Sequence, residues 1–139
     1  MSEPGVLRQD DPRIPDPEDL YRRIMGIFIV ARQDSGGREL TSQAFSDRLG
    51  EISVDRSSLI SAVGCLAMGN AGHVGVAAVT ARQARQLEQL VVWHPLPGNR
   101  AHALICGKQD QTRSARKRIA KKLARAARWV YPEDQNPLI

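Results

Sequence analysis

Near the C-terminus, apolar residues recur at the three- and four-residue spacing of an α-helix: Ala115, Ile119, Leu123, Ala126 and Val130. They form one narrow stripe, and the residues between them are good helix formers. Thr112 or Ser114 can cap the first turn, and Pro132 ends the helix. The pattern predicts a helix that lies close against a sheet or another helix, because a small, alanine-rich stripe does not hold a helix alone in water.

Residues 75–107, before this helix, show a pattern of strands separated by a helix and a turn. GVAAVT at 75–80 is typical of a short buried strand, and Thr80 with Gln83 forms a capping box that opens a helix through ARQARQLEQL. VVWHP at 91–95 then leads into a Pro-Gly-Asn turn. AHALICG at 101–107 is a further strand, which runs toward the C-terminal helix.

The first half carries weaker signals. LYRRIMGIFIVA at 20–31 combines a helical opening with a β-branched ending, and DSGG at 34–37 is a turn before RELTSQAF, which together indicate a hairpin. EISV at 51–54 is another candidate strand. Asp55 or Ser57 can then cap a helix through SLISAVGCLAM that ends at Gly69 and Asn70.

These elements predict one small α+β domain, with a sheet of three to five strands and helices packed on it, or a small α/β sandwich. A chain of 139 residues with 42% hydrophobic residues suits a single domain with a real core. Residues 1–18 are acidic and rich in proline, which predicts an extended or disordered arm. We therefore expect the domain at 19–132 and a short tail at 133–139.

Charge adds a functional signal at the C-terminal helix. Residues 113–128 contain eight basic and no acidic residues, whereas the whole chain has a net charge of +5, so the rest of the chain is net negative. Like charges four residues apart on a helix are unfavourable unless an anion relieves them. The basic arc opposite the apolar stripe consists of Arg113, Lys117, Arg118, Lys121, Arg125 and Arg128.

A basic helical face fits several kinds of partner, or none if it is only a solvated surface. Nucleic acid is the first choice, and with only 4% aromatic residues we expect contact with the phosphate backbone instead of base stacking. An acidic protein surface is the second choice, and membrane binding is the third, because the apolar stripe lacks bulky anchors. The chain itself holds an acidic cluster that could fold back on the helix or reach a second copy: Asp10, Asp11, Asp16, Glu18 and Asp19.

The sequence gives little support to other chemistry. Cys65 and Cys106 lie in apolar runs without a CxxC motif, which predicts buried, reduced thiols. His73, His94 and His102 are too far apart for a local metal motif, so we expect turn or surface histidines, and neither a metal nor a cofactor. The chain has no leader-like start and no apolar run of membrane-spanning length, which predicts a cytoplasmic protein.

Two sets of motifs resemble those of known groups of proteins. LYRRI at 20–24, LTSQAF at 40–45 and QLE at 86–88 follow an order similar to the three-part signature of ADP-ribosyltransferases. That resemblance implies an enzyme whose arginine and hydroxyl hold NAD and whose glutamate, Glu88, supports transfer. In that family the glutamate lies at a turn-to-strand junction, whereas here the capping box at Thr80 places Glu88 inside a helix.

LYRRI, TSQAFSD and SVDRSSL, together with the basic helix, also resemble a group of small uncharacterised bacterial proteins over residues 17–132. This second resemblance implies a compact domain that works within a larger assembly. The sequence thus predicts a non-enzymatic binding or adaptor protein that contacts the nucleic-acid backbone and is able to form homo- or hetero-oligomers. The alternatives are a subunit that docks an acidic protein surface and, third, the ADP-ribosyltransferase-like enzyme.

Overall fold

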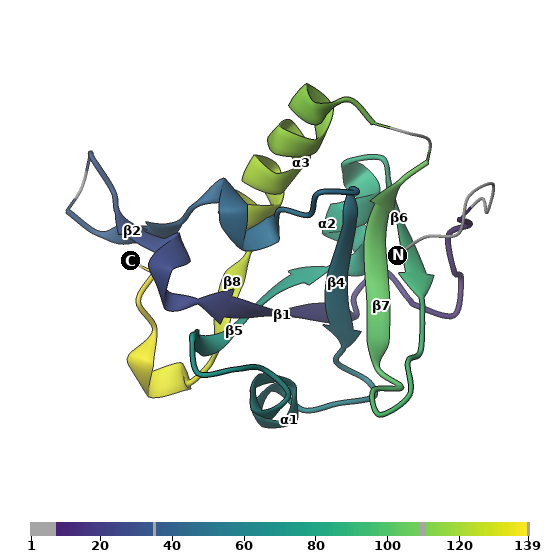
Figure 1. Cartoon of the computed structure of the whole chain (residues 1–139), viewed down its shortest axis with the longest axis horizontal. Helices are drawn as coiled ribbons and strands as arrows, with labels where there is room; N and C mark the ends of the chain where they lie inside the picture. Colours follow the sequence, from purple (N-terminus) through teal and green to yellow (C-terminus); the bar gives the residue numbers. More distant parts are fainter. Residues whose placement is uncertain (1–7, 35, 109–110, 139) are drawn as a thin grey trace.

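A six-stranded antiparallel sheet forms the centre of the protein (Figure 1). The computed structural model describes residues 8–34, 36–108 and 111–138. All neighbouring strands of this sheet run antiparallel. In their spatial order they are β6 (Gln89–Trp93), β7 (His102–Gly107), β4 (Glu51–Arg56), β1 (Asp19–Met25), β5 (His73–Thr80) and β8 (Arg128–Tyr131).

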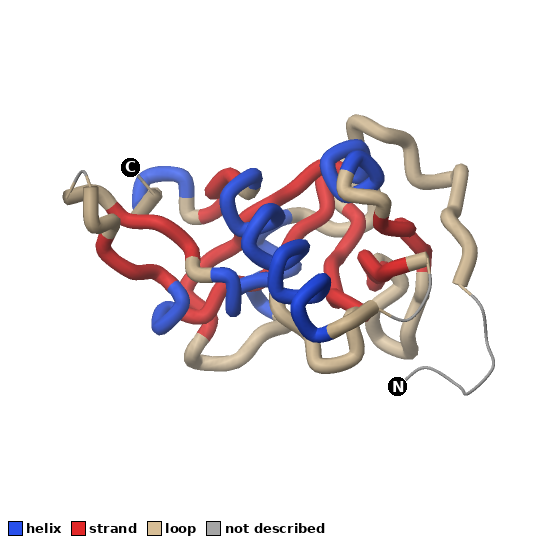
Figure 2. Tube along the Cα trace, turned by 90° about the horizontal axis from the view of Figure 1, so that it is seen from above, coloured by secondary structure: helices blue, strands red, loops and turns tan. Residues whose placement is uncertain are grey.

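Helices lie on both sides of this sheet. Figure 1 shows α3 (Arg113–Ala126) above the strands and α1 (Ala62–Ala67) below them. In the view from above, α3 crosses in front of the strands (Figure 2). The remaining elements are α2 (Ala81–Gln86), a hairpin of β2 (Ile29–Ala31) and β3 (Arg38–Leu40), and the 3-10 helices η1 (Gly26–Phe28), η2 (Ser42–Phe45) and η3 (Glu133–Gln135).

The core lies between one face of the sheet and the elements α2, α3 and η2. Side chains alternate along β1, so Leu20 and Ile24 point to this face, where both are fully buried. Phe45 of η2 and Leu123 of α3 belong to the same buried cluster. Several of the helical core residues are alanines, such as Ala120, and these small side chains allow the helices to lie close to the sheet.

The structure is a small single domain of mixed helices and strands, as expected, but its main sheet has six strands instead of three to five. The additional strands come from segments that we expected to be helical. β1 replaces the expected helical opening at residue 20, β6 begins inside the helix expected after Thr80, and β8 replaces the end of the C-terminal helix. Pairing with distant strands overrides the local pattern here, and β1 pairs with β4 and β5 on its two edges.

Backbone geometry explains why α2 is shorter than its pattern predicts. The capping box of Thr80 and Gln83 is present and opens the helix, which confirms that prediction. Glu88, however, has a φ of 61°, in the left-handed region that commonly follows a helix end. The chain therefore leaves the helix after Gln86 and enters β6 at Gln89.

Two predictions for the first half are settled as well. The hairpin is confirmed, because β2 and β3 pair in register from Ile29 opposite Leu40. The helix expected after β4 does form, but its N-cap is Ser61 and not Asp55 or Ser57. The later start has a simple cause, since Asp55 is still part of strand β4.

The segment before β1 lies against the domain in its described part. Residues 1–7 of the expected arm lie outside the described residues, while residues 8–18 contain no helix or strand. Ile14 is nevertheless fully buried in the core. Asp11 donates its N–H to the carbonyl of Val91 (2.9 Å), and Asp10 accepts the N–H of the same residue (2.9 Å). These contacts attach the segment to the outer edge of β6.

Candidate nucleic-acid interface

Polar contacts fix the N-terminal end of α3. The hydroxyl of Thr112 accepts a backbone N–H of the first turn (3.1 Å), so the cap is Thr112 and not Ser114. The backbone carbonyl of Gln111 accepts from the Arg116 guanidinium (2.7 Å), and its side-chain oxygen accepts from Gln89 of β6 (3.2 Å). The start of the helix is therefore tied to the edge strand of the sheet.

The buried face of α3 is rotated relative to the predicted stripe. Ala120, Leu123 and Ala124 are buried, Ile119 is half-buried, and Ala126 is exposed. The prediction placed Ala126 in the stripe from helical spacing alone. In the structure α3 packs against η2 and ends at residue 126, and its buried positions lie one step further around the wheel.

The opposite face of α3 is exposed and cationic. Five of the six predicted site residues are exposed there or, for Arg113, at the N-terminal end of the helix, and α3 adds Lys122, which the prediction left out. Its four-residue spacing from Arg118 was the signal that could have identified it. In the part of the chain that the structure describes, none of these six side chains makes an ion pair or a hydrogen bond. We call them the α3 cation face: Arg113, Lys117, Arg118, Lys121, Lys122 and Arg125.

Arg128, the sixth predicted residue, does not belong to this face. It lies on strand β8, beyond the end of the helix. Its guanidinium forms an ion pair with Asp19 at the start of β1. The charge of Arg128 is therefore partly neutralised within the domain, which corrects its assignment to the basic arc.

The acidic cluster near the N-terminus is occupied by arginines outside α3. Arg85 of α2 pairs with both Asp10 (3.0 Å) and Asp16 (2.8 Å). The same guanidinium donates to the carbonyls of Asp11 (3.0 Å) and Ile14 (2.8 Å). One arginine thus holds this segment in place and uses two of the five acids.

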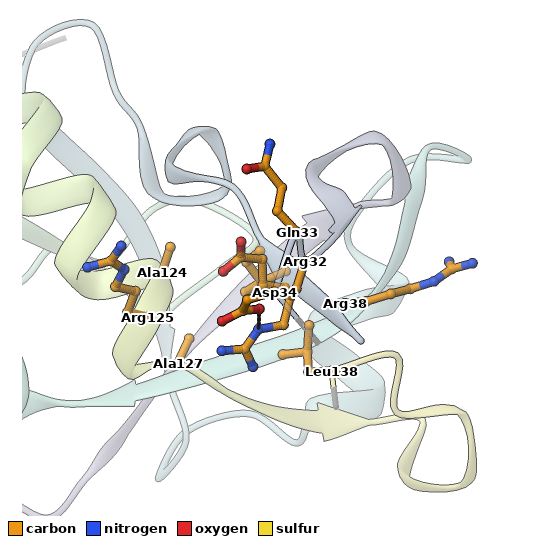
Figure 3. Close-up of a pocket in the computed structure, with 10 residues that line it drawn as sticks. Arg32, Gln33, Asp34, Arg38, Ala124, Arg125, Ala127 and Leu138 are labelled. Carbon is orange, nitrogen blue, oxygen red and sulfur yellow. Dashed lines mark ion pairs between the residues drawn. The ribbon is translucent and has the colours of Figure 1, made fainter. Parts of the chain in front are cut away.

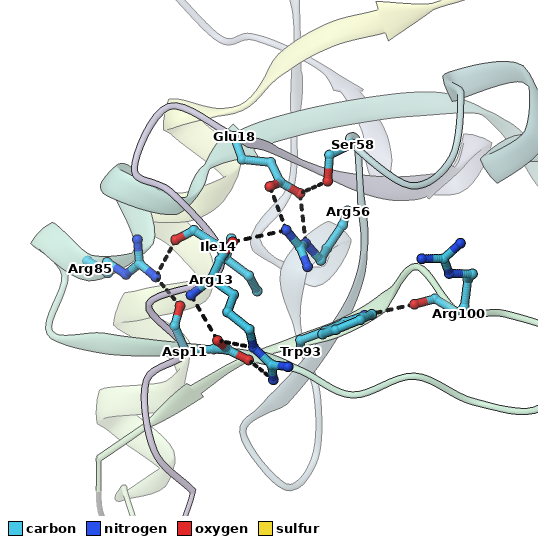
Figure 4. A network of polar contacts seen from close by, with 9 residues as sticks. All are labelled: Asp11, Arg13, Ile14, Glu18, Arg56, Ser58, Arg85, Trp93 and Arg100. Carbon is cyan, nitrogen blue, oxygen red and sulfur yellow. Dashed lines mark hydrogen bonds and ion pairs between the residues drawn. The ribbon is translucent and has the colours of Figure 1, made fainter.

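Two further acids of the cluster pair close to Trp93 (Figure 4). Asp11 pairs with Arg13 (2.7 Å), and Glu18 pairs with Arg56 (2.9 Å) in a contact that is almost fully buried. Both guanidinium groups also lie over the indole ring of Trp93, at 4.9 Å and 5.1 Å from its centre. The cluster therefore does not fold back on the α3 cation face, and its described acids do not neutralise the cations there.

A groove of about 720 Å³ lies between the C-terminal end of α3 and the β2–β3 hairpin. Arg32 at its centre is 3.8 Å from Asp34. Figure 3 shows the side chains of Arg38 and Arg125 pointing away from the groove on opposite sides. The charged side chains that remain in the groove are Arg32, Asp34 and Glu39, and Arg125 lines its edge while its guanidinium points outward.

The histidines differ from the expectation of turn or surface positions. His102 is buried, its Nδ1 lies 2.8 Å from the His94 carbonyl, and its Nε2 lies 3.1 Å from the Ser53 hydroxyl. The two imidazoles also meet, with 3.2 Å between their Nδ1 atoms. Pairing of β6 with β7 brings them together, which the eight-residue separation in sequence concealed. Within the described ranges, no group of three or more His, Cys, Asp or Glu residues could hold a metal ion.

Glu88 lies apart from the other two parts of the ADP-ribosyltransferase-like signature, which contact each other through Arg22 and the Ala44 carbonyl. Arg22 and Arg23 are in β1, residues 42–45 form the 3-10 helix η2 and not a strand, and Glu88 lies between α2 and β6. Glu88 is thus at a turn-to-strand junction, which corrects the expectation that it lies within a helix. Strands β4 and β7 nevertheless separate β1 from β6, so the sheet does not bring the glutamate to the arginines.

Both cysteines are buried and unpaired, which confirms that they are buried thiols. Among the described helices, none is long and apolar enough to cross a membrane. No protein-family model, curated protein or solved structure matches the chain. The functional argument therefore rests on the charges and contacts of the chain's own residues.

Proposed function

We propose that the protein binds the phosphate backbone of nucleic acid through the α3 cation face, as a binding or adaptor component of a larger assembly. The observation that carries the proposal is the absence of neutralising contacts. Six exposed cations lie on one helix, and within the described chain no acid pairs with any of them. The acids of the N-terminal cluster pair with Arg13, Arg56, Arg85 and Arg128 instead.

The free energy of the isolated helix argues for an external anion. Lys117, Lys121 and Arg125 follow one another at four-residue spacing, and each such like-charge pair costs roughly 0.2–0.5 kcal/mol. Arg113 adds a cation at the N-terminal end, where the helix dipole is already positive and no acid occupies the first turn. A row of phosphates along the helix would replace these unfavourable charge interactions with favourable ones.

The dimensions and the aromatic residues favour backbone contact over base reading. A helix of 14 residues is about 20 Å long, which lets it follow several successive phosphates. Trp129, one of the two aromatic residues beside the helix, donates its indole N–H to the carbonyl of Pro132 (2.7 Å) and is half-buried. A side chain held in this way does not offer a platform for stacking bases.

Fluorescence anisotropy with labelled duplex DNA, single-stranded DNA and RNA across a salt series tests the proposal. If about five phosphates are contacted, the logarithm of the binding constant falls against the logarithm of salt concentration with a slope of about −4 to −5. No binding even at low salt would overturn the proposal and leave an acidic protein surface as the partner to test.

Two double variants with the same change of net charge separate the helix face from general basicity. Lys117→Glu with Lys121→Glu should weaken binding at least about tenfold and reduce the salt slope by about two. The matched control, Arg82→Glu with Arg100→Glu, changes two exposed arginines on α2 and in the β6–β7 turn. Equal losses in the two variants would contradict a role for this particular face.

A further inference from the structure

The main sheet is split between β1 and β4. β1 pairs with β5 from Asp19 to Met25, but it pairs with β4 only at Leu20 and Tyr21. Beyond Tyr21 the two strands separate, and the Arg22 side chain takes the place of the missing ladder. Its Nη1 donates to the Ser53 carbonyl of β4 (2.8 Å) and its Nε to the Ala44 carbonyl of η2 (3.0 Å).

This separation leaves a cleft of about 140 Å³. That volume corresponds to a few water molecules at about 30 Å³ each, which is enough for one small oxyanion but not for a nucleoside. Phe28, Ala44 and Val54 contribute to one side of it. The polar part of the lining consists of Tyr21, Arg22, Arg23, Ser53, Asp55 and His73.

Arg22 is a cation whose described hydrogen-bond partners are all backbone carbonyls. Besides Ser53 and Ala44, it reaches only the carbonyl of Ser46, at 3.4 Å. Burial of the guanidinium lowers its pKa, and Asp47 offsets this only through a longer-range attraction. These bonds use three of the five guanidinium N–H donors, so the Nη atoms retain capacity to bind an anion.

Arg23 and His73 add to the positive character of the cleft. Arg23 pairs with the buried Asp55 (2.9 Å), which in turn accepts from the Asn99 amide (2.8 Å). His73 accepts the Asn70 N–H at its Nδ1 (2.9 Å), so in the neutral imidazole Nε2 carries the hydrogen and can donate it to a ligand. Burial, Arg23 and Arg22 together lower the pKa of His73 below its ordinary value of 6.5.

The charges around the cleft favour a dianion. Two guanidinium groups and one carboxylate give a net charge of one, which protonation of His73 would raise to two. The other titratable groups around the cleft are Tyr21, which lines it, and Cys65 of α1, which contacts Arg23; burial raises the pKa of both, so neither adds a charge at pH 7. A bound dianion would offset the repulsion by Arg22 and Arg23 and would thus raise the His73 pKa, and the added proton would go to Nδ1 in place of its contact with the Asn70 N–H.

We propose that the cleft between β1 and β4 binds the phosphate dianion of inorganic phosphate or of a phosphate monoester. This site is separate from the α3 cation face and does not depend on its function. Arg22 and Arg23, which approach the cleft from opposite faces of β1, would donate to the phosphate oxygens, and the Nε2–H of His73 would complete the set of donors. A carboxylate carries a single negative charge, which the net charge of the cleft already balances, so it would bind without uptake of a proton.

Titration of the wild-type protein with inorganic phosphate, followed by NMR of the His73 imidazole, tests this proposal. We expect saturable shifts and a higher His73 pKa, together with proton uptake seen calorimetrically as a binding enthalpy that depends on the buffer. Phenyl phosphate in a parallel titration separates a monoester site from a site for free phosphate. No shift at His73, or equal binding of acetate without proton uptake, would overturn the proposal.

Variants check the assignment without removing Arg22, which the fold itself requires. His73→Gln should abolish the proton uptake and weaken phosphate binding about tenfold, because it removes a charge-assisted donor. His94→Gln, outside the cleft, should leave both unchanged. The variant Lys117→Glu with Lys121→Glu should retain the phosphate response at His73, and loss of that response would show that the anion binds α3 instead.

Discussion

The indole ring of Trp129 occupies the space that a side chain at Gly75 would need. A Cβ atom at this glycine would lie 2.1 Å from Cζ2 of the indole and 2.6 Å from the carbonyl oxygen of Tyr131. Gly75 is on β5 and Trp129 on β8, so this close approach allows β8 to pair with the sheet directly after α3 ends. The position of α3 on the core therefore depends on the absence of a side chain at residue 75.

Substitution of this glycine should destabilise the whole domain. We expect Gly75→Ala to lower the free energy of unfolding by about 2–3 kcal/mol, because the indole and β8 must shift to admit a methyl group. Urea denaturation followed by tryptophan fluorescence measures the change. Val74→Ala at the exposed neighbouring position is the control and should cost less than about 1 kcal/mol. A neutral Gly75→Ala variant would contradict the tight packing of Trp129.

The same contact shows why the sequence predicted α3 but not its end. The cap at Thr112 and the capping box at Thr80 are local, and both are confirmed because all their atoms lie within a few residues. The strand β8 depends on Gly75, more than fifty residues away, and no local periodicity carries that information. Helical propensity therefore extended the predicted helix through residues that pair with β5.

The candidate sites also divide into features that one segment determines and features that depend on residues far apart in the sequence. The cation face was predictable because it is a property of one helix, and five of its six residues were identified from spacing alone. The pairing of Arg128 with Asp19 was not, since these residues are 109 positions apart. The β1–β4 cleft was also not predictable, because it arises where two strands stop pairing, and the sequence of neither strand marks that point.

The buried pair of Glu18 and Arg56 should make stability depend on pH. Burial alone would raise the Glu18 pKa, but hydrogen bonds from Arg56 and Ser58 outweigh it and lower the pKa below its ordinary value of 4.5. A carboxylate with a lowered folded-state pKa stabilises the protein fully above about pH 5. That contribution is lost as the pH falls below 4.5 through the folded-state pKa.

Glu18→Gln tests this dependence directly. At pH 7 it leaves Arg56 buried without its carboxylate, so we expect a loss of about 3 kcal/mol in the free energy of unfolding. At pH 3 the difference from wild type should become smaller, because Glu18 itself begins to be protonated. The exposed Glu133→Gln serves as the control in urea denaturation at both pH values. A difference for Glu18→Gln that is independent of pH would contradict the ion pair as its cause.

The two thiols should be unreactive in the native protein. Burial, followed by the nearby Asp55, raises the pKa of Cys65 to about 12, and burial raises that of Cys106 to about 11. Thiolates are the reactive form, so an aromatic disulfide reagent at pH 8 should modify both residues only after unfolding. Ser114→Cys, at the exposed start of α3 among arginines, provides a reactive comparison. Rapid labelling of the wild-type thiols in native buffer would contradict this prediction and show that the interior opens on the timescale of the labelling reaction.

Lys122 and Arg128 distinguish the cation face in the structure from the basic arc expected from the sequence. Lys122 is exposed on α3 and makes no described ion pair, whereas Arg128 pairs with Asp19 on another strand. We therefore expect Lys122→Gln to weaken nucleic-acid binding two- to fivefold and to reduce the salt slope by about one, as loss of one phosphate contact does. Arg128→Gln should change binding less than twofold, because this cation is already neutralised in part.

Anisotropy titrations of both single variants with the same labelled duplex check this contrast, and urea denaturation provides the second readout. Arg128→Gln should lower the free energy of unfolding by less than about 1 kcal/mol, because its ion pair with Asp19 is partly exposed. Lys122→Gln should leave it unchanged or raise it slightly, since it removes the like-charge pair with Arg118. If Arg128→Gln weakens binding more than Lys122→Gln does, the interface extends past the end of α3 onto β8, and the cation face must be redrawn.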